Sequence, residues 1–291
     1  MCPNESSLTA RYDFAGRIAI VTGASSGIGL AVARRLVDEG AVVCLVAAPD
    51  DRDDLEAAGR ALATERSRPL TLAGDIGDPA TARDAVSRTL DTFGRLDFLV
   101  ANAGILASGD TLELKLSDLD ALWHVNVRGI YLAATEAARA MAERSGGSIV
   151  ITASTAAILG QEGGAAYNAT KGAVATLARS LAVDLAKYAI RVNAVAPGWV
   201  DTRQNANVSQ NAAEWARHRT HVPMDRFASP GEIASVMAFL LSDEASYVSG
   251  AVVPIDGGFS AGVRLIDWDT PPVPLPPRAR RIWGRHEEAP G

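Results

Sequence analysis

Short apolar runs alternate with longer segments of helical periodicity along most of the chain. The apolar runs cover residues 17–22, 41–47, 69–74, 96–104, 148–154, 190–198 and 251–258. Nearly every position in these runs is apolar, so both faces of the sheet that they form should be covered by other elements. The pattern therefore predicts seven strands in an α/β, doubly wound parallel sheet.

Helical patterns fill the segments between these strands, at 27–39, 52–66, 79–93, 117–144, 164–188 and 230–241. Two of them begin with a capping side chain directly before a proline, in Asp78-Pro79 and Ser229-Pro230. Glu232 completes a capping box with Ser229. Regular alternation of strands and helices predicts helices on both faces of the sheet.

The composition changes near the two ends of the chain. A chain of 291 residues with 48% hydrophobic content can bury one large core. We expect an N-terminal arm at 1–14, a single domain at 15–259 and an extension at 260–291. The extension holds six prolines, which favours an extended arm. Trp268 and Trp283 would be the residues that anchor this arm to a surface, and the alternative is a disordered tail.

The charge balance limits the class of partner. A formal net charge of −6 without a dense Lys/Arg block argues against nucleic acid or an anionic membrane and favours a small molecule. No run of about 20 apolar residues predicts a membrane span. Two cysteines, Cys2 and Cys44, indicate a cytoplasmic protein without disulfides. We expect no metal site, because neither the cysteines nor the histidines show ligand spacing, and we assign surface or packing roles to His124, His218, His221 and His286.

A glycine-rich loop follows the first predicted strand directly. The sequence TGASSGIG, residues 22–29, leads from this strand into a helical pattern. Gly23, Gly27 and Gly29 allow a tight turn, close approach of the backbone to a pyrophosphate and close packing of the helix on the sheet. The helix N-terminus adds N–H donors and a favourable dipole. The loop predicts that the chain binds a dinucleotide.

The choice between NAD and NADP stays open at the end of the second strand. An acid there commonly selects NAD and a cation NADP, but the position holds Ala47 and Ala48. Asp50 and Asp51 would repel a 2′-phosphate, whereas Arg52 would bind one.

The sequence YNATK places Tyr167 and Lys171 four residues apart in a predicted helix, so both lie on one face. With the glycine loop and further motifs, it makes the chain resemble the classical short-chain dehydrogenase/reductase family over about residues 15–259. The further motifs are Asp75-Ile76, ANAG at 101–104, Asn126 in HVNVRG, Ser154 thirteen residues before Tyr167, and Pro197-Gly198. The family pattern is altered at Ala101, where an asparagine is commoner, and at Ala47.

The resemblance implies a Rossmann-type sheet, a nicotinamide cofactor (NAD or NADP) and an oxidoreductase that interconverts a secondary alcohol and a ketone. It implies a catalytic set of Asn126, Ser154, Tyr167 and Lys171. It implies cofactor contacts from Gly23, Ser25, Ser26, Gly27, Ile28, Gly29, Asp75, Ile76, Asn102, Ala103, Gly104, Tyr167, Lys171, Pro197, Gly198, Val200 and Thr202. By the same analogy we expect a homotetramer built through 117–144, 164–188 and the region near PIDGG.

The chemistry explains why Tyr and Lys would be paired. A phenol titrates near pKa ~10, so proton transfer near neutral pH requires a drop of about 2–3 units, or roughly 3–4 kcal/mol. An ammonium about 4–5 Å away supplies roughly that amount at an effective dielectric near ~20. We therefore expect Lys171 to lower the pKa of Tyr167.

Two polar residues would complete this chemistry. Ser154 ends the fifth strand and would hydrogen-bond the substrate oxygen, unless it is only a turn or cap serine. Asn126 interrupts an apolar stripe; the family role is to hold a proton-relaying water, and the alternative is a structural amide that bonds backbone.

A long polar segment, 199–227, is expected to be a loop that closes over the substrate. Its apolar candidates for shaping a pocket are Trp199, Trp215 and Met224.

Two other functions remain open from the sequence. One is a dinucleotide-binding regulator or scaffold without chemistry, and the other is an isomerase or dehydratase that recycles its cofactor. The complete Asn–Ser–Tyr–Lys set favours the oxidoreductase.

Overall fold

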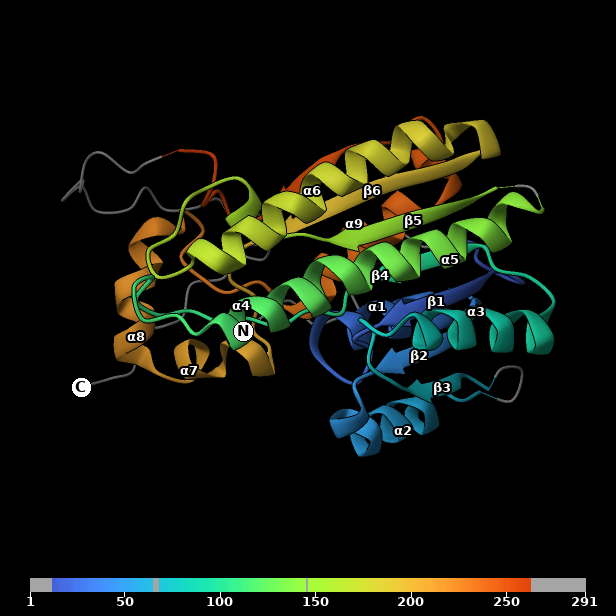
Figure 1. The fold of residues 1–291 in the computed structure, drawn as a ribbon, viewed down its shortest axis with the longest axis horizontal. Coiled ribbons are helices and arrows are strands. Elements are labelled where there is room, and N and C mark those ends of the chain that lie inside the picture. The colour runs from blue at the N-terminus through green and yellow to red at the C-terminus, as the bar shows by residue number, and fades with distance from the viewer. Residues whose placement is uncertain (1–11, 65–67, 145, 263–291) are drawn as a thin grey trace, which may run out of the picture.

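The computed structural model describes residues 12–64, 68–144 and 146–262. The chain forms one sheet between two layers of helices (Figure 1). Most of the expected N-terminal arm and nearly all of the proline-rich extension, with Trp268 and Trp283, lie outside the described residues.

Seven parallel strands form the sheet in the order β3-β2-β1-β4-β5-β6-β7, which confirms the predicted doubly wound Rossmann-type fold. The strands are β1 (Ile18–Thr22), β2 (Val42–Ala47), β3 (Leu70–Ala73), β4 (Phe98–Ala101), β5 (Gly147–Thr152), β6 (Ile190–Pro197) and β7 (Val252–Ile255). The strand order reverses between β1 and β4, and ligands bind such sheets outside the carboxyl ends of the strands at that point.

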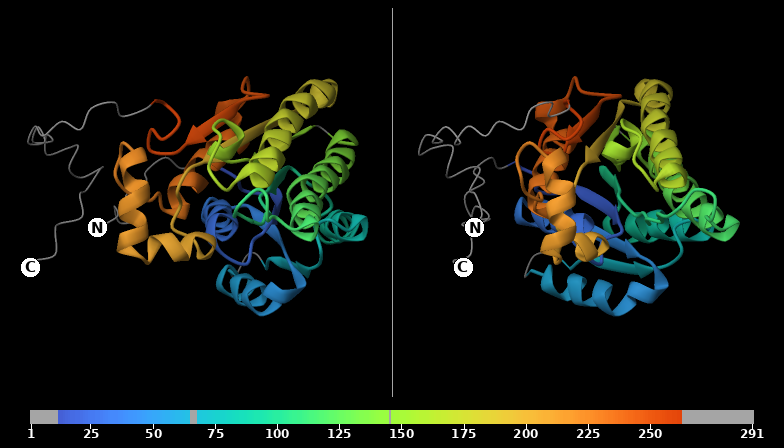
Figure 2. Two further views of the ribbon diagram at one scale, coloured as in Figure 1. Left: turned by 60° about the vertical axis from the view of Figure 1, so that its left-hand side comes forward. Right: turned by 90° about the vertical axis from the view of Figure 1, so that its left-hand side faces the viewer.

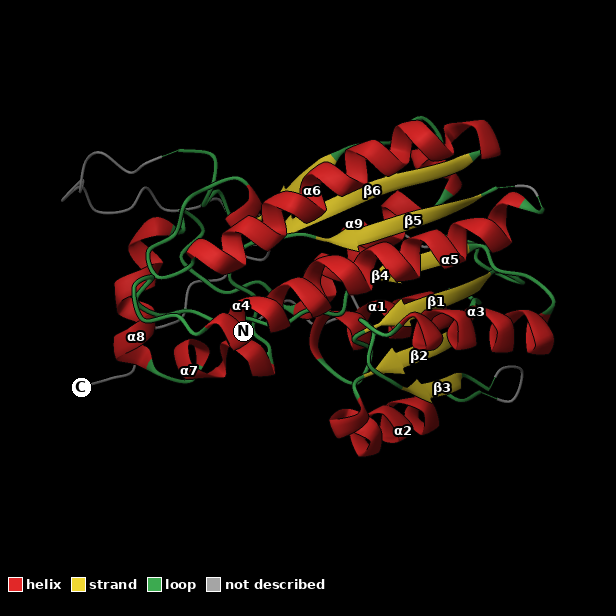
Figure 3. Cartoon of the chain, viewed as in Figure 1, coloured by secondary structure: helices red, strands yellow, loops and turns green. Residues whose placement is uncertain are grey.

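Among the described residues, six helices cover the sheet, three on each face (Figure 3). One apolar core packs beneath α3 (Pro79–Phe93), α5 (Ile130–Ala142) and α6 (Ala165–Leu185). The other packs beneath α1 (Gly27–Asp38), α2 (Arg52–Ala61) and α9 (Pro230–Leu241). Both predicted caps are present, because Asp78 accepts from the amide of Ala80 and the Ser229–Glu232 capping box is complete.

The helix expected at 117–144 is interrupted. It divides into α4 (Leu116–Leu122), a π-helical segment over Trp123–Gly129, and α5. The extra residue per turn in the π-helical segment changes the direction of the side chains on either side of it. Gly129 lies in this segment, and a Cβ there would be 2.6 Å from Cγ2 of Ile76, so this close approach requires a glycine.

The segment expected as a loop at 199–227 is largely helical. It contains α7 (Ala206–Ser209) and α8 (Ala212–His218), joined to short 3₁₀ turns. Both helices lie beyond the carboxyl ends of the strands, at the edge of the molecule (Figures 1 and 2). The sequence signal was weak because these helices are only four and seven residues long.

Candidate active site

Two cavities meet at the strand-order reversal between β1 and β4. The larger, of about 700 Å³, lies over the ends of β1, β2 and β3, and the smaller, of about 360 Å³, lies over the ends of β5 and β6. They share part of their lining: Gly23, Asp51, Ala103, Gly104 and Ile105. Together they form one cleft with two differently lined ends.

The glycine loop borders both cavities at Gly23. Gly23 and Gly27 have φ values of +65° and +56°, which side chains rarely adopt. A Cβ on Gly29 would be 2.1 Å from the Gly23 carbonyl oxygen, so the first turn of α1 packs directly on the loop. Ser25, Ser26, Gly27 and Ile28 line the smaller cavity, whereas Gly29 lies behind it. This bare backbone at a helix N-terminus fits a pyrophosphate.

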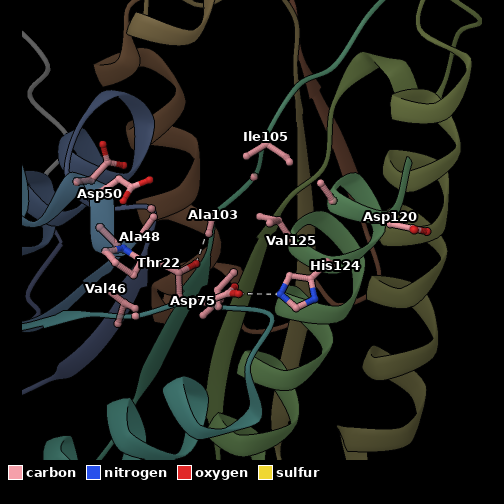
Figure 4. A pocket seen from close by; sticks show the side chains of 18 residues that line it. Thr22, Val46, Ala48, Asp50, Asp75, Ala103, Ile105, Asp120, His124 and Val125 are labelled. Carbon is pink, nitrogen blue, oxygen red and sulfur yellow. Dashed lines mark hydrogen bonds and ion pairs between the residues drawn. The ribbon is translucent and has the colours of Figure 1, made fainter. Parts of the chain in front are cut away.

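The larger cavity contains the residues expected around an adenosine. Ala47, Ala48, Asp50, Asp51, Asp75 and Ile76 line it (Figure 4). Arg52, the cation that would bind a 2′-phosphate, is exposed on α2 and is not part of the lining.

His124 is a site residue that the sequence did not reveal. Its Nε2 lies 2.8 Å from Oδ2 of Asp75, across the larger cavity (Figure 4). Burial raises the pKa of Asp75, but hydrogen bonds from His124 and the Gly77 amide outweigh it, so the pKa lies below its usual value. His124 is a surface histidine, as expected, with 38% of its side chain exposed, but its pairing with Asp75 adds a contact in the lining of the larger cavity. No local sequence signal announced this contact, because His124 and Asp75 are 49 positions apart in the chain.

Asn102 holds three strand ends together. Its Nδ2 donates to the carbonyl oxygens of Thr22 and Gly23, and its Oδ1 accepts from Oγ1 of Thr152. Oγ1 of Thr22 in turn accepts from the amides of Asn102 and Ala103. This network fixes the ANAG backbone next to the glycine loop.

The smaller cavity brings together Ser154, Tyr167 and Lys171. Pro197, Gly198, Val200 and Thr202 line it from the end of β6. Oγ of Ser154 accepts from the Ala156 amide, so this serine is a cap as well as a cavity residue. Three of the four expected catalytic side chains thus face one space, from two elements.

Asn126 is the fourth, and it lies behind the cavity wall. Its side chain is fully buried and exchanges two hydrogen bonds with the backbone of Ile105, at 2.8 and 2.9 Å. Its Nδ2 is also 3.3 Å from Oγ1 of Thr170. The interpretation as an amide that bonds backbone is therefore correct, while the water-holding role stays a prediction.

Lys171 is 3% exposed and donates from Nζ to the carbonyl oxygen of Thr152 at 3.0 Å. Burial lowers the pKa of this ammonium to about 8. Nζ lies 5.7 Å from the centroid of the Tyr167 ring. The helix therefore places the amine beside the phenol, as the spacing predicted.

The expected fall in the pKa of Tyr167 is not what this structure gives. Burial raises the pKa of the phenol, and a hydrogen bond with Ser154 lowers it only in part. The amine is bound to a carbonyl and has lost part of its own preference for the charged form, so one buried cation does not offset the desolvation of the phenolate.

Comparison with known proteins decides the family. A family model described as enoyl-(acyl carrier protein) reductase matches residues 23–260. A cis-4-hydroxycyclohexanecarboxylate dehydrogenase of Sinomonas cyclohexanicum is 39% identical over 249 residues, which cover 85% of this chain and 98% of the relative. The crystal structure of a levodione reductase superposes with a TM-score of 0.80 at 37% identity, over 86% of this chain and 99% of the other. The chain belongs to the short-chain dehydrogenase/reductase family.

This short-chain dehydrogenase/reductase is an NAD(P)-dependent oxidoreductase that acts on alcohol and ketone groups. An L-rhamnose 1-dehydrogenase (NAD(P)(+)) of Sphingomonas sp. (strain SKA58) is 36% identical over 252 residues, 84% of this chain and 96% of the relative. The name of that relative carries both cofactors, so the family relationship leaves the choice between them open.

The segment that follows β6 covers the smaller cavity of this short-chain dehydrogenase/reductase. Trp199 lines the cavity, and its ring packs against His218 of α8 at 4.6 Å between centroids. Trp215 instead packs on Phe227 at 4.2 Å, and Met224 lines neither cavity. Of the three apolar candidates, Trp199 is thus the one that lines either of these two described cavities.

Arg203 ties this covering segment to the other side of the cleft. Its guanidinium lies 2.7 Å from Asp51 and 2.9 Å from Asp54. Oγ of Ser25 also donates to Asp51, at 3.4 Å. The segment that covers the smaller cavity is thus joined to the residues that line the larger one.

Two other findings limit the chemistry of the described residues. Within residues 12–64, 68–144 and 146–262, no group of three or more His, Cys, Asp or Glu side chains is placed to hold a metal. None of the helices described there has the length and apolar character needed to cross a membrane.

The buried amine predicts a specific pH dependence of stability. The pKa of Lys171 is about 8 in the folded chain and has its ordinary value of 10.5 in the unfolded chain. The unfolded state therefore binds more protons between these values, and the native state gains stability as the pH rises through them. Relative to Lys171→Met, the wild-type free energy of unfolding should rise by roughly 3 kcal/mol between about pH 7 and about pH 10. Urea unfolding of both proteins at the two pH values measures this change. If the difference in free energy of unfolding between wild type and Lys171→Met is the same at both pH values, the pKa of Lys171 is not lowered by burial.

Proposed function

We propose that Tyr167 is the general acid and base of this oxidoreductase, with Ser154 and Lys171 beside it. The observation that carries the proposal is the convergence of the three side chains on one cavity, which joins the glycine-loop cleft at Gly23 and Gly104. When bound, the nicotinamide supplies or accepts the hydride. During reduction the Oη–H bond of Tyr167 breaks and its proton goes to the substrate oxygen, and oxidation reverses this transfer.

The neighbouring groups would hold the proton transfer in place. Ser154 interacts with the Tyr167 hydroxyl and would donate to the same substrate oxygen as negative charge develops on it. Lys171 would stabilise the phenolate left on Tyr167, since its Nζ lies beside the ring. Asn126, fixed to the Ile105 backbone, would reach a water only through one of its remaining hydrogen-bonding positions.

We propose a division of the cleft between the two halves of the dinucleotide. Asp75 and Ile76 would contact the adenine in the larger cavity. Gly23, Ser25, Ser26, Gly27 and Ile28 would hold the pyrophosphate, with Gly29 supporting the loop from behind. Asn102, Ala103, Gly104, Tyr167, Lys171, Pro197, Gly198, Val200 and Thr202 would surround the nicotinamide half.

A panel of secondary alcohols and ketones, assayed by the absorbance of the reduced nicotinamide, tests the proposed reaction. Cis-4-hydroxycyclohexanecarboxylate is a sensible first member, because a relative named for it is 39% identical. Turnover of any member supports the proposal. Tight binding of NADH or NADPH without turnover across the panel would instead support the regulator or scaffold.

We propose that the protein is a homotetramer. An apolar groove between α6 and the π-helical segment is lined by Trp123, Val127, Tyr131 and Leu177, and large apolar side chains are exposed there. Tyr247, next to β7, is fully exposed on a second surface. Light scattering should give a mass of about four chains, and Tyr131→Glu should shift it to a smaller assembly. A wild-type mass of one chain would refute the proposal.

We propose a cytoplasmic location, which rests on the scarcity of cysteine. The chain has two cysteines, and Cys44 is a free, buried thiol. A reducing compartment suits such a chain. Fractionation of the native source with an antibody checks it.

A further inference from the structure

We infer that this chain prefers NAD(H) to NADP(H), and that Asp50 is the residue that decides the preference. The inference rests on the proposed binding of the adenosine half of the dinucleotide in the larger cavity. NADP differs from NAD only by a phosphate on the 2′-oxygen of that half, which adds about two negative charges at neutral pH. The charges around the cavity therefore decide which dinucleotide is accepted.

The larger cavity has a negative lining. Among its described lining residues there are four carboxylates and no Lys or Arg, the carboxylates being Asp50, Asp51, Asp75 and Asp120. A ribose hydroxyl donates a hydrogen bond, which a carboxylate accepts. A 2′-phosphate instead carries negatively charged acceptor oxygens, which a carboxylate repels. The lining as a whole favours the unphosphorylated ribose.

Partners distinguish the carboxylates that lie near the end of β2 and β3. Asp51 is paired with Arg203 at 2.7 Å, and Asp75 with His124 at 2.8 Å. No ion pair or side-chain hydrogen bond reaches Asp50 from any residue the structure describes. Asp50 is exposed in the 3₁₀ turn that follows β2, on the side of the cavity opposite His124 (Figure 4). Its carboxylate oxygens therefore have no described side chain as a partner and are free to accept from a ligand.

The short side chains before this turn explain how Asp50 would reach the ribose. Ala47 and Ala48 occupy the strand end where the family commonly places its selecting residue, and both line the cavity. Neither side chain extends beyond Cβ, so the space at the strand end stays open to the acid two positions later. Asp50 would thus take over the selecting role from a shifted position.

Neither nearby arginine is placed to reverse this preference. Arg52 is exposed on α2 and outside the cavity lining. Arg203 is held by two carboxylates, at 2.7 Å from Asp51 and 2.9 Å from Asp54. Both terminal nitrogens of Arg203 are thus engaged by carboxylates, whose charges offset the one that it would offer to a 2′-phosphate.

Dissociation constants for NADH and NADPH, measured by calorimetry without substrate, test the inference. The wild type should bind NADH at least about tenfold more tightly, which corresponds to about 1.4 kcal/mol. Asp50→Asn should reduce this ratio by about tenfold, chiefly by improving the binding of NADPH. Asp53→Asn is the matched control, because it removes the same charge one turn away and outside the cavity lining, and it should leave the ratio unchanged.

The arginines give the opposite outcomes. Suppose that the wild type binds NADPH well and that Arg52→Gln or Arg203→Gln selectively weakens the binding of NADPH. Those cations would then select NADP, and the inference would be wrong. An equal effect of Asp50→Asn and Asp53→Asn would also overturn it, because it would reflect overall charge alone. Failure of both dinucleotides to bind would refute the proposed function instead, so the two failures are distinguishable.

Discussion

Tyr167→Phe should lower kcat by about 10²–10⁴-fold, the usual contribution of general acid–base catalysis, while the affinity for the reduced cofactor stays within about twofold. The variant keeps the ring and loses only the hydroxyl that interacts with Ser154. Since Tyr167 lines the smaller cavity and the described lining holds no second tyrosine, the substrate oxygen would have no other phenolic proton donor beside it. Steady-state kinetics and calorimetry on the same preparation measure the two quantities.

Tyr188→Phe is a matched control for this variant. Tyr188 is half-exposed beyond the C-terminal end of α6, so removing its hydroxyl changes the same chemical group outside both cavities. Its kcat should equal that of the wild type. A Tyr167→Phe enzyme with wild-type kcat would show that the proton comes from another group. A parallel loss of cofactor affinity would assign Tyr167 a binding role in place of the catalytic one.

Gly29→Ala should disrupt both the fold near the glycine loop and the binding of the dinucleotide. The added Cβ would lie 2.1 Å from the Gly23 carbonyl oxygen and 2.8 Å from Nδ2 of Asn102, and these positions are fixed by backbone and by a hydrogen-bonded amide. Either α1 or the loop must move, at a cost of roughly 1–3 kcal/mol or more. The amide donors of the loop then lose their positions, and NADH affinity should fall at least about tenfold.

Gly109→Ala is the corresponding control. A Cβ at Gly109 meets no atom within 4 Å, and its φ is not in the left-handed region. The free energy of unfolding of this variant should lie within about 0.5 kcal/mol of the wild-type value, and its affinity for NADH should equal that of the wild type. Urea unfolding and calorimetry of both variants measure the differences. Wild-type stability and affinity in Gly29→Ala would mean that the contact between α1 and the loop is not as tight as the structure shows.

Whether a contact of the site could be predicted depends on how far apart its two residues lie in the sequence. Tyr167 and Lys171 are one helical turn apart, so spacing alone placed them on one face. Lys171 finds its hydrogen-bond partner Thr152 nineteen residues away, and burial in the folded chain lowers the pKa of the amine. The expected effect on Tyr167 was wrong because the sequence gave the distance along the helix but not the desolvation.

The longer-range contacts were beyond sequence reasoning. His124 meets Asp75 from a separation of 49 residues, and Arg203 meets Asp51 from one of 152. Neither residue type predicts such a partner, because histidine and arginine are commonly found on the surface. These contacts exist because the segments that follow β2, β3, β4 and β6 meet at one cleft, which depends on the order of the strands.

The amino-acid sequence by itself determined the strands, the covering helices, the glycine loop and the identity of the family, since these depend on periodicity and on motifs within a few turns of chain. The tertiary structure decided the π-helical segment, the helices within 199–227, the direction of the pKa shifts, and which carboxylates of the larger cavity have partners. Those features depend on which side chains packing brings together and on how much water it excludes, and a linear pattern does not contain that information.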